Sequence, residues 1–344
     1  MSSDLFSEQV ASTSPRQSCS GGVFSLRSGG DDLTAVKELD LPYVSGLSAR
    51  FRWSETEPEP GKYDFTLLER ARDICVAKHK LLMVRVTAGM YSPSWLYEKG
   101  VPSVCFGSDE VGGGWMKQGA EGRMPVPWDS QYLDRWAAFL KVLGEKIKDW
   151  PGLYCVQMTG GGFIGEMHLP TRTEPTNTQW KKFGISDEKL VPMWQRIITT
   201  YDQTMPPNVG IALDLGTPFK VPKSQTPQLV YDWAREKFPG RVWFQQNGLK
   251  EKYPAESNWS TKIREASATT IGGYQMVGGG KFLDKETGDR RKAFERAIED
   301  RCLYVEVYRG DLLDPKWEKA VQFLAEGLRK NVRDRTIHAT QPVP

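Results

Sequence analysis

Residues 154–170 read YCVQMTGGGFIGEMHLP. A short apolar run, Leu153 to Met158, leads into three glycines and then to a single acidic residue, Glu166. A buried strand that opens into a glycine-rich loop is where α/β enzymes place functional side chains. We therefore interpret this stretch as the fourth strand of a (β/α)8 barrel and its loop, with Glu166 as a candidate catalytic residue.

The rest of the chain alternates between short apolar runs and amphipathic stretches, which is typical of parallel α/β folds. The expected strands are Gly22–Arg27, Val44–Trp53, Leu81–Thr87, Leu153–Thr159, Val209–Leu215, Val242–Asn247, Ile271–Val277 and Leu303–Tyr308. The expected helices are Asp31–Leu39, Phe65–His79, Asp129–Lys148, Lys189–Gln203, Gln228–Phe238, Ser260–Ser267, Asp289–Asp300 and Pro315–Lys330. This order predicts a single (β/α)8 TIM barrel over residues 21–330, between a poorly ordered extension (1–20) and a polar tail (331–344).

Charge and hydropathy exclude several classes of partner. The 344 residues include 46 basic and 43 acidic ones, well mixed, for a net charge of +3. A nucleic-acid-binding protein usually shows a concentrated basic face, so no nucleic-acid partner is expected. No apolar run approaches the roughly 18 residues that cross a bilayer. Residues 1–20 lack the apolar core of a signal peptide, so we expect a cytoplasmic protein unless a leader precedes this sequence. The oligomeric state is left open.

No cofactor or metal site is expected. The five cysteines are dispersed without C-x-x-C spacing, and His79, His168 and His338 lie far apart in the sequence. These patterns indicate neither a disulfide framework nor a zinc site. No glycine-rich loop with the spacing of a phosphate-binding motif follows a strand.

Alternation along the strands predicts polar side chains at the barrel axis. If Val305 and Val307 face the helices, then Glu306 faces inward, and the same reasoning turns Asp214 inward. The other residues expected to face the axis are Arg27, Ser48, Arg50, Arg52, Arg85, Gln157, Asn247 or its neighbours, Gln275, Tyr304 and Tyr308. Burying so many polar groups costs free energy unless they pair with one another or meet a polar ligand. Mutual pairing and a polar ligand both stay open. We favour a polar ligand because the charges cluster at one end of the barrel.

Two motifs resemble clan A glycoside hydrolases, including beta-galactosidase-type enzymes. Residues 53–65, WSETEPEPGKYDF, are similar to the W-x-x-x-E-P-x-x-G-x-Y-D-F signature after the second strand, and residues 91–96, YSPSWL, to the loop after the third. In that clan the fourth strand ends in Asn-Glu and the seventh supplies a Glu nucleophile. This chain departs from both, since its fourth strand ends in Thr159-Gly160-Gly161 and its seventh offers only Tyr274 and Gln275. Residues 165–170, GEMHLP, resemble the beta-amylase loop whose Glu is the general acid.

This resemblance implies a glycosidase that acts on an oligosaccharide or glycoside with two carboxyl groups. We expect Glu166 to be the acid, its pKa raised by apolar neighbours. Glu306 leads as base or nucleophile, and Asp214 is the second candidate. Because strands four and eight lie across the barrel, the Glu166–Glu306 pair predicts an inverting gap of about 6.5–9.5 Å.

The substrate-binding candidates fall into two groups. Polar side chains would bind sugar hydroxyl groups, and aromatic rings would stack on sugar faces, although Trp53 is equally compatible with core packing. These candidates are Arg50, Arg52, Arg85, Gln157, His168, Asn247, Gln275, Trp53, Tyr91, Trp95 and Tyr308. The main alternative is a related barrel that binds carbohydrate without cleaving it. A lyase or isomerase would need a metal or phosphate site, for which the sequence gives no evidence.

Overall fold

The computed structural model describes residues 21–27, 31–110, 116–220, 223–252, 258–280 and 284–340, without the side chains of 258 and 336–340. The extension expected at residues 1–20 and the last four residues of the expected tail lie outside this part of the chain.

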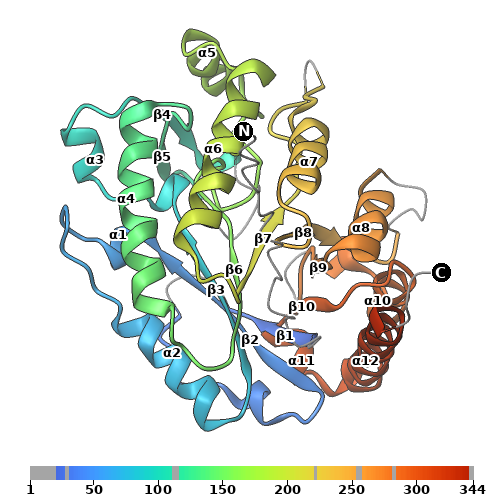
Figure 1. Ribbon diagram of the computed structural model, residues 1–344. Coiled ribbons are helices and arrows are strands. Elements are labelled where there is room, and N and C mark those ends of the chain that lie inside the picture. Colours follow the sequence, from blue (N-terminus) through green and yellow to red (C-terminus); the bar gives the residue numbers. More distant parts are fainter. Residues whose placement is uncertain are drawn as a thin grey trace, which may run out of the picture.

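Within the described residues, eight parallel strands close into a barrel in the order β1-β10-β9-β8-β7-β6-β3-β2 (Figure 1). Each lies at one of the eight predicted strand positions, so the TIM-barrel prediction is confirmed. The strands are β1 (Gly22–Leu26), β2 (Val44–Arg52), β3 (Leu81–Thr87), β6 (Leu153–Gln157), β7 (Gly210–Asp214), β8 (Val242–Leu249), β9 (Gly272–Met276) and β10 (Tyr304–Tyr308).

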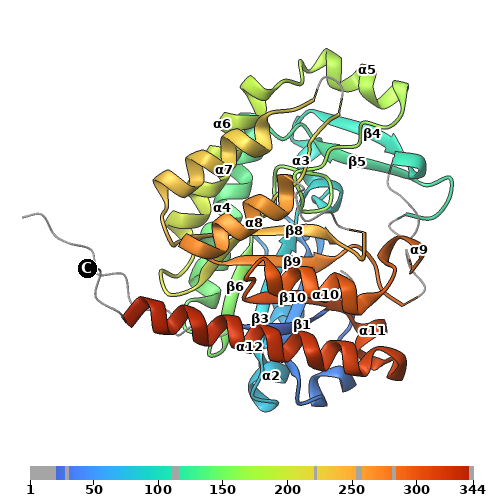
Figure 2. The same ribbon diagram turned by 90° about the vertical axis from the view of Figure 1, so that its right-hand side faces the viewer.

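Helices surround this barrel, and α12 runs along its outside next to α10 (Figure 2). Their apolar faces cover the outward side chains of the strands, which form the main hydrophobic core. The helices are α1 (Trp53–Thr56), α2 (Thr66–Ala77), α3 (Trp95–Glu98), α4 (Ser130–Ile147), α5 (Glu174–Lys182), α6 (Asp187–Thr204), α7 (Thr226–Lys237), α8 (Asn258–Thr269), α9 (Asp284–Thr287), α10 (Arg290–Glu299), α11 (Arg309–Leu313) and α12 (Glu318–Thr340).

Several regions differ from the sequence-based expectation. The helix expected at Asp31–Leu39 is only a short 3-10 turn, η1 (Lys37–Asp40). The closing helix continues past Lys330 to Thr340, so residues 331–340 are helical and do not form a separate tail. The expected connection Ala88–Pro127 contains an antiparallel hairpin of β4 (Ser103–Gly107) and β5 (Glu121–Pro125).

This hairpin packs against α5, which the sequence analysis also missed. The side-chain amide of Gln179 pairs with the backbone of Cys105 on β4. Glu110 follows β4, and its carboxylate accepts hydrogen bonds from the backbone nitrogens of Arg172 (2.6 Å) and Thr173 (2.8 Å) just before α5. The long connection after β3 is therefore joined to the segment that follows β6.

The barrel interior is filled at its amino-terminal end by an aromatic plug, formed by Phe24, Tyr154, Trp243 and Tyr304. The Phe24 and Tyr154 rings stack with centroids 5.0 Å apart, and Tyr154 meets Trp243 edge-on at the same distance. Glycines make room for these rings. A Cβ at Gly210 would lie 2.2 Å from Trp243, and one at Gly273 would lie 2.2 Å from Tyr304.

Above the plug the predicted alternation holds, with one exception. Ala212, Tyr304 and Glu306 face the axis, whereas Ile211, Val305 and Val307 join the outer core. The exception is Arg27, which was expected to face inward. It lies one residue beyond β1 and forms ion pairs with Asp31 (2.9 Å) and Glu38 (3.1 Å). The prediction was wrong because side chains alternate along a strand: Phe24 and Leu26 face inward, so Arg27 faces outward.

Replacing Gly273 by alanine should test the plug. The new methyl group would overlap the Tyr304 ring, so we expect a loss of about 1–3 kcal/mol in the free energy of unfolding, measured in urea. In the background Tyr304→Leu the added cost of Gly273→Ala should shrink towards zero. An equal cost in both backgrounds would show that the ring is not what opposes the methyl group.

Candidate active site

The glycine-rich loop after β6 folds back on itself and carries Glu166 over the barrel. A Cβ at Gly162 would lie 1.5 Å from the carbonyl oxygen of Glu166, so the loop can close this tightly only with glycine there. Gly165 has a φ of +93°, a conformation that favours glycine. The backbone nitrogen of Phe163 donates to the carbonyl of His168 at 3.0 Å, which closes the turn around Glu166.

The Glu166 carboxylate is held by two side chains. Nδ2 of Asn247 donates to Oε1 at 2.8 Å, and Nδ1 of His168 lies 3.0 Å from Oε2. Burial alone raises the pKa of this carboxyl group, but the hydrogen bond and charge of His168, the hydrogen bond from Asn247 and the charge of Arg85 together outweigh it, and the pKa falls to about 2. The expectation of a raised pKa was therefore wrong, because it considered only the apolar neighbours and not these partners. Glu166 is ionised at neutral pH.

Asp214, at the end of β7, is the second carboxyl group at this site. Nδ2 of Asn247 also donates to its Oδ2, at 2.5 Å. Because bonds of 2.8 and 2.5 Å leave the same nitrogen atom, the Glu166 and Asp214 oxygens are at most about 5.3 Å apart. Burial, followed by the negative charge of Glu166, raises the pKa of Asp214 well above its ordinary value. The two neighbouring carboxyl groups thus favour opposite protonation states.

Glu306 faces the axis as predicted but lies deeper in the barrel. Its side chain is fully buried and accepts hydrogen bonds from Ser48, from Gln157 (2.9 Å) and from Gln245 (2.7 Å). On β8, Gln245 contacts Glu306, whereas Asn247, two residues nearer the carboxyl end, contacts Glu166. The expected Glu166–Glu306 pair is therefore separated by a polar layer, and the carboxyl group next to Glu166 is Asp214.

The predicted arginines and glutamines line this part of the barrel. Arg85 is buried, donates to Gln157 at 2.7 Å and lies 3.7 Å from Glu306. Arg50 is buried beside it in the strand register and donates to Gln275. Nη1 of Arg85 and Oδ1 of Asp214 are buried and have no hydrogen-bond partner among the described residues. A donor and a carboxyl oxygen inside the barrel are thus left for a polar ligand.

Of the remaining predicted residues, some lie at the rim of the barrel and others lie in the outer core. Arg52 is half-exposed, forms a 2.9 Å ion pair with Glu55 and lies over the Tyr91 ring. Tyr91 and Tyr308 are partly exposed. Trp53 and Trp95 are instead buried in the outer core, packed edge-on with centroids 6.0 Å apart. Both rings lie in the outer core and not among the residues that face the barrel axis, which corrects the prediction that they stack on a sugar.

Sequence reasoning missed Gln245, which lies at the centre of this network. It contacts Asn247, Glu306, Gln157 and Tyr304. Strand alternation contained the clue, because an inward Asn247 places Gln245 on the same face.

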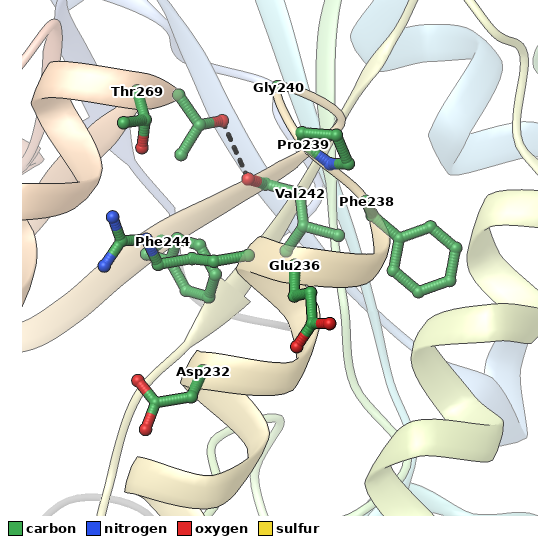
Figure 3. A pocket seen from close by; sticks show the side chains of 10 residues that line it. Asp232, Glu236, Phe238, Pro239, Gly240, Val242, Phe244 and Thr269 are labelled. Atoms are coloured by element: carbon green, nitrogen blue, oxygen red, sulfur yellow. Dashed lines mark hydrogen bonds between the residues drawn. The ribbon is translucent and has the colours of Figure 1, made fainter.

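A separate cavity of about 380 Å³ lies at the other end of the barrel (Figure 3). Its lining comes from the end of α7, the start of β8 and the end of α8, and includes Phe238, Val242 and Thr270. These segments adjoin the amino-terminal ends of the strands, whereas Glu166, Asp214 and Asn247 lie at the carboxyl-terminal ends. The cavity is therefore distinct from the carboxyl pair.

Over the described residues, no group of three or more His, Cys, Asp or Glu side chains could hold a metal ion. Among the same residues, no helix is long and apolar enough to span a membrane.

Comparison with known proteins agrees with this fold. A family model described as beta-galactosidase (glycoside hydrolase family 42) matches residues 27–160. No curated protein matches the chain. The match covers the second-strand motif and ends just before the loop that carries Glu166.

Solved glycosidase structures share the architecture. The catalytic domain of beta-amylase from Paenibacillus polymyxa superposes with a TM-score of 0.58 at 10% identity, over 93% of this chain and 99% of that one. A catalytic mutant of the family 42 beta-galactosidase Gan42B from G. stearothermophilus gives 0.56 at 13% identity, over 92% and 57%. A beta-galactosidase from Rahnella gives 0.55 at 11% identity, over 91% and 57%.

These similarities indicate which group of TIM barrels this fold resembles. The family match and the shared architecture confirm a fold like that of clan A glycoside hydrolases. At such low identity the structures establish the fold alone, and this chain spans 57% of the length of each of the two beta-galactosidase chains.

Replacing Asp214 by asparagine should stabilise the protein at neutral pH. A carboxyl group whose pKa is raised by folding contributes stability that is present at low pH and lost as pH rises from its ordinary value of 3.8 towards the folded value. Asparagine does not ionise and so does not lose this stability. We therefore expect the free energy of unfolding of Asp214→Asn to exceed that of the parent by about 1 kcal/mol at pH 7, and the difference to disappear below pH 3.8. Urea unfolding at several pH values measures it.

The exposed Asp232 provides the control for that measurement. Asp232→Asn, measured in the same way, gives the effect of a carboxyl-to-amide change at the surface, against which the Asp214→Asn effect is compared. If the stability difference between Asp214→Asn and the parent is the same at pH 7 and at pH 3.5, the carboxyl group of Asp214 is not perturbed by burial.

Proposed function

We propose that the protein is a glycoside hydrolase whose two catalytic carboxyl groups are Glu166 and Asp214. The observation that carries the proposal is the sharing of one Asn247 nitrogen by two carboxyl groups whose environments drive their pKa values apart. A protonated and an ionised carboxyl group side by side are what glycosidic bond hydrolysis requires. The clan A-like fold and the unpartnered Arg85 and Asp214 atoms support the same conclusion.

The protonation states assign the roles. Asp214, whose pKa is raised, is the general acid and gives its proton to the leaving glycosidic oxygen as the bond to the sugar's anomeric carbon breaks. Glu166, which is ionised, attacks that carbon and forms a glycosyl-enzyme ester. Asp214, now a carboxylate, takes a proton from the water that hydrolyses the ester, which returns both groups to their starting states. This reverses the expectation that Glu166 is the acid.

The spacing favours retention of configuration. Carboxyl groups in retaining glycosidases are about 5–5.5 Å apart, and those in inverting enzymes about 6.5–9.5 Å. The Glu166 and Asp214 oxygens that share the Asn247 nitrogen are at most about 5.3 Å apart, which is closer than the inverting range. The inverting expectation rested on Glu306, which lies deeper in the barrel.

The remaining inward side chains form a binding surface in this proposal. Arg85 offers a buried donor next to the carboxyl pair, and Arg50, Gln157 and Gln275 extend that polar surface. Tyr91 and Tyr308 are the aromatic candidates for contact with a sugar ring, and Arg52 and His168 lie at the rim. The substrate class is a glycoside or oligosaccharide.

A carbohydrate-binding barrel without activity is the second candidate. It is favoured by the chain's departures from the clan pattern, Thr159-Gly160 after β6 and Gln275 on β9, where Gln275 is bonded to Arg50. This alternative predicts sugar binding that does not depend on a protonated Asp214.

Hydrolysis of a panel of α- and β-linked nitrophenyl glycosides and oligosaccharides distinguishes the two candidates. Glu166→Gln and Asp214→Asn should each lower kcat by roughly 10²–10⁴-fold, because each removes an acid, base or nucleophile. Glu59→Gln, at an exposed carboxylate, is the matched control and should keep full activity. Equal background rates for the parent and both variants, together with sugar binding by calorimetry, would favour the non-catalytic barrel.

The stereochemistry of the first product tests the carboxyl pair. With Glu166 as nucleophile, NMR of the nascent sugar should show the same anomer as the substrate. The opposite anomer would exclude the Glu166–Asp214 arrangement even if both residues prove essential.

A further inference from the structure

The proposed mechanism does not use Glu306, although its carboxylate is the most enclosed in the barrel. Every polar neighbour that contacts it donates: Ser48 through its hydroxyl group, Gln157 through Nε2 at 2.9 Å, and Gln245 through Nε2 at 2.7 Å. The Arg85 guanidinium lies 3.7 Å away. Because a carboxylate accepts hydrogen bonds and does not donate them, each amide beside it must turn its NH2 group towards it.

This constraint passes outward through Gln245. Its Nε2 faces Glu306 and also donates to Oδ1 of Asn247 at 2.6 Å, while its Oε1 accepts from Gln157 (2.9 Å) and Tyr304 (2.8 Å). The hydrogen bonds at the two ends of the Gln245 side-chain amide can therefore form in only one of its two orientations. With Oδ1 of Asn247 turned to Gln245, its Nδ2 is left facing Glu166 and Asp214.

We propose that Glu306, Gln245 and Asn247 form an amide relay in which the buried Glu306 fixes the orientation of Asn247, so that one nitrogen donates to both carboxyl groups of the active site. Asn247 and Gln245 are positioning residues in this scheme, and Glu306 is the anchor of the relay. The catalytic meaning of the relay rests on the proposed function, but the orientation itself does not. Asn247 reversed by 180° would point its oxygen at the Glu166 carboxylate, which is repulsive.

The relay predicts that a change at Gln245 alters Glu166 without touching it. Gln245→Met fills a similar volume but cannot donate to Oδ1 of Asn247, so the Asn247 amide is no longer held in one orientation. Since the hydrogen bond from Asn247 lowers the pKa of Glu166, that pKa should rise by about one pH unit. The other groups that act on Glu166 or face it, namely His168, Arg85, Arg50, Tyr308 and Asp214, are all retained.

The experiment is a titration of carboxyl ¹³C resonances by NMR in protein labelled at Glu and Asp, with Glu166 identified by the signal lost in Glu166→Gln. Gln246→Met is the matched control: Gln246 is the next residue on β8, and its Oε1 accepts from the backbone of Gly248 instead of joining the relay. We expect a higher Glu166 pKa in Gln245→Met and the parent value in Gln246→Met.

Gln245→Asn provides a second test if the methionine variant does not fold. It keeps an amide in the polar layer but is too short to reach Glu306 and Asn247 together, so it should raise the same pKa. Parent values in both Gln245 variants would overturn the relay. Because this readout needs no substrate, the relay can fail while glycosidase activity stands, and the activity can be absent while the relay stands.

Discussion

The barrel depends on one constraint: polar side chains that point at its axis must find partners there. Glu306 is the extreme case, because an isolated buried carboxylate costs several kcal/mol, which is comparable with a domain's net stability. Ser48, Gln157, Gln245 and Arg85, from four other strands, meet that need together. The aromatic plug beneath and the carboxyl pair above are separated by this layer.

The fold was predictable because its periodicity repeats eight times. Strands such as β7 and β10 show the alternation that sends Ile211 and Val305 outward and Ala212 and Glu306 inward, and errors in single boundaries do not change the number of strands. The β4–β5 hairpin and α5 were missed for the opposite reason. They occur once, they are short, and tertiary contacts such as the Glu110 bonds stabilise them more than local propensity does.

The candidate site was predictable as a set of residues but not as a set of roles. Asp214 and Asn247 were expected at the axis, yet strand phase alone does not tell which carboxyl groups become neighbours. The pKa of Glu166 shows the limit most clearly. Its apolar neighbours and His168 are visible in the sequence, but the contact between the His168 ring and the carboxylate, and the hydrogen bond from Asn247, 81 positions away, exist only in the folded protein. Trp53 was ambiguous because a ring that suits a sugar also suits a core.

The bracing of the Glu166 loop bears on how this barrel can be recombined with others. Glu110 ties the long connection after β3 to the chain just before α5, so the loop between β6 and α5 is anchored by a segment from the preceding strand–helix unit. A chimaera that received the glycine-rich loop alone would leave its far end unanchored. Transplantation therefore has to carry the hairpin and the loop as one cassette, although some sixty residues separate Glu110 from the backbone it caps.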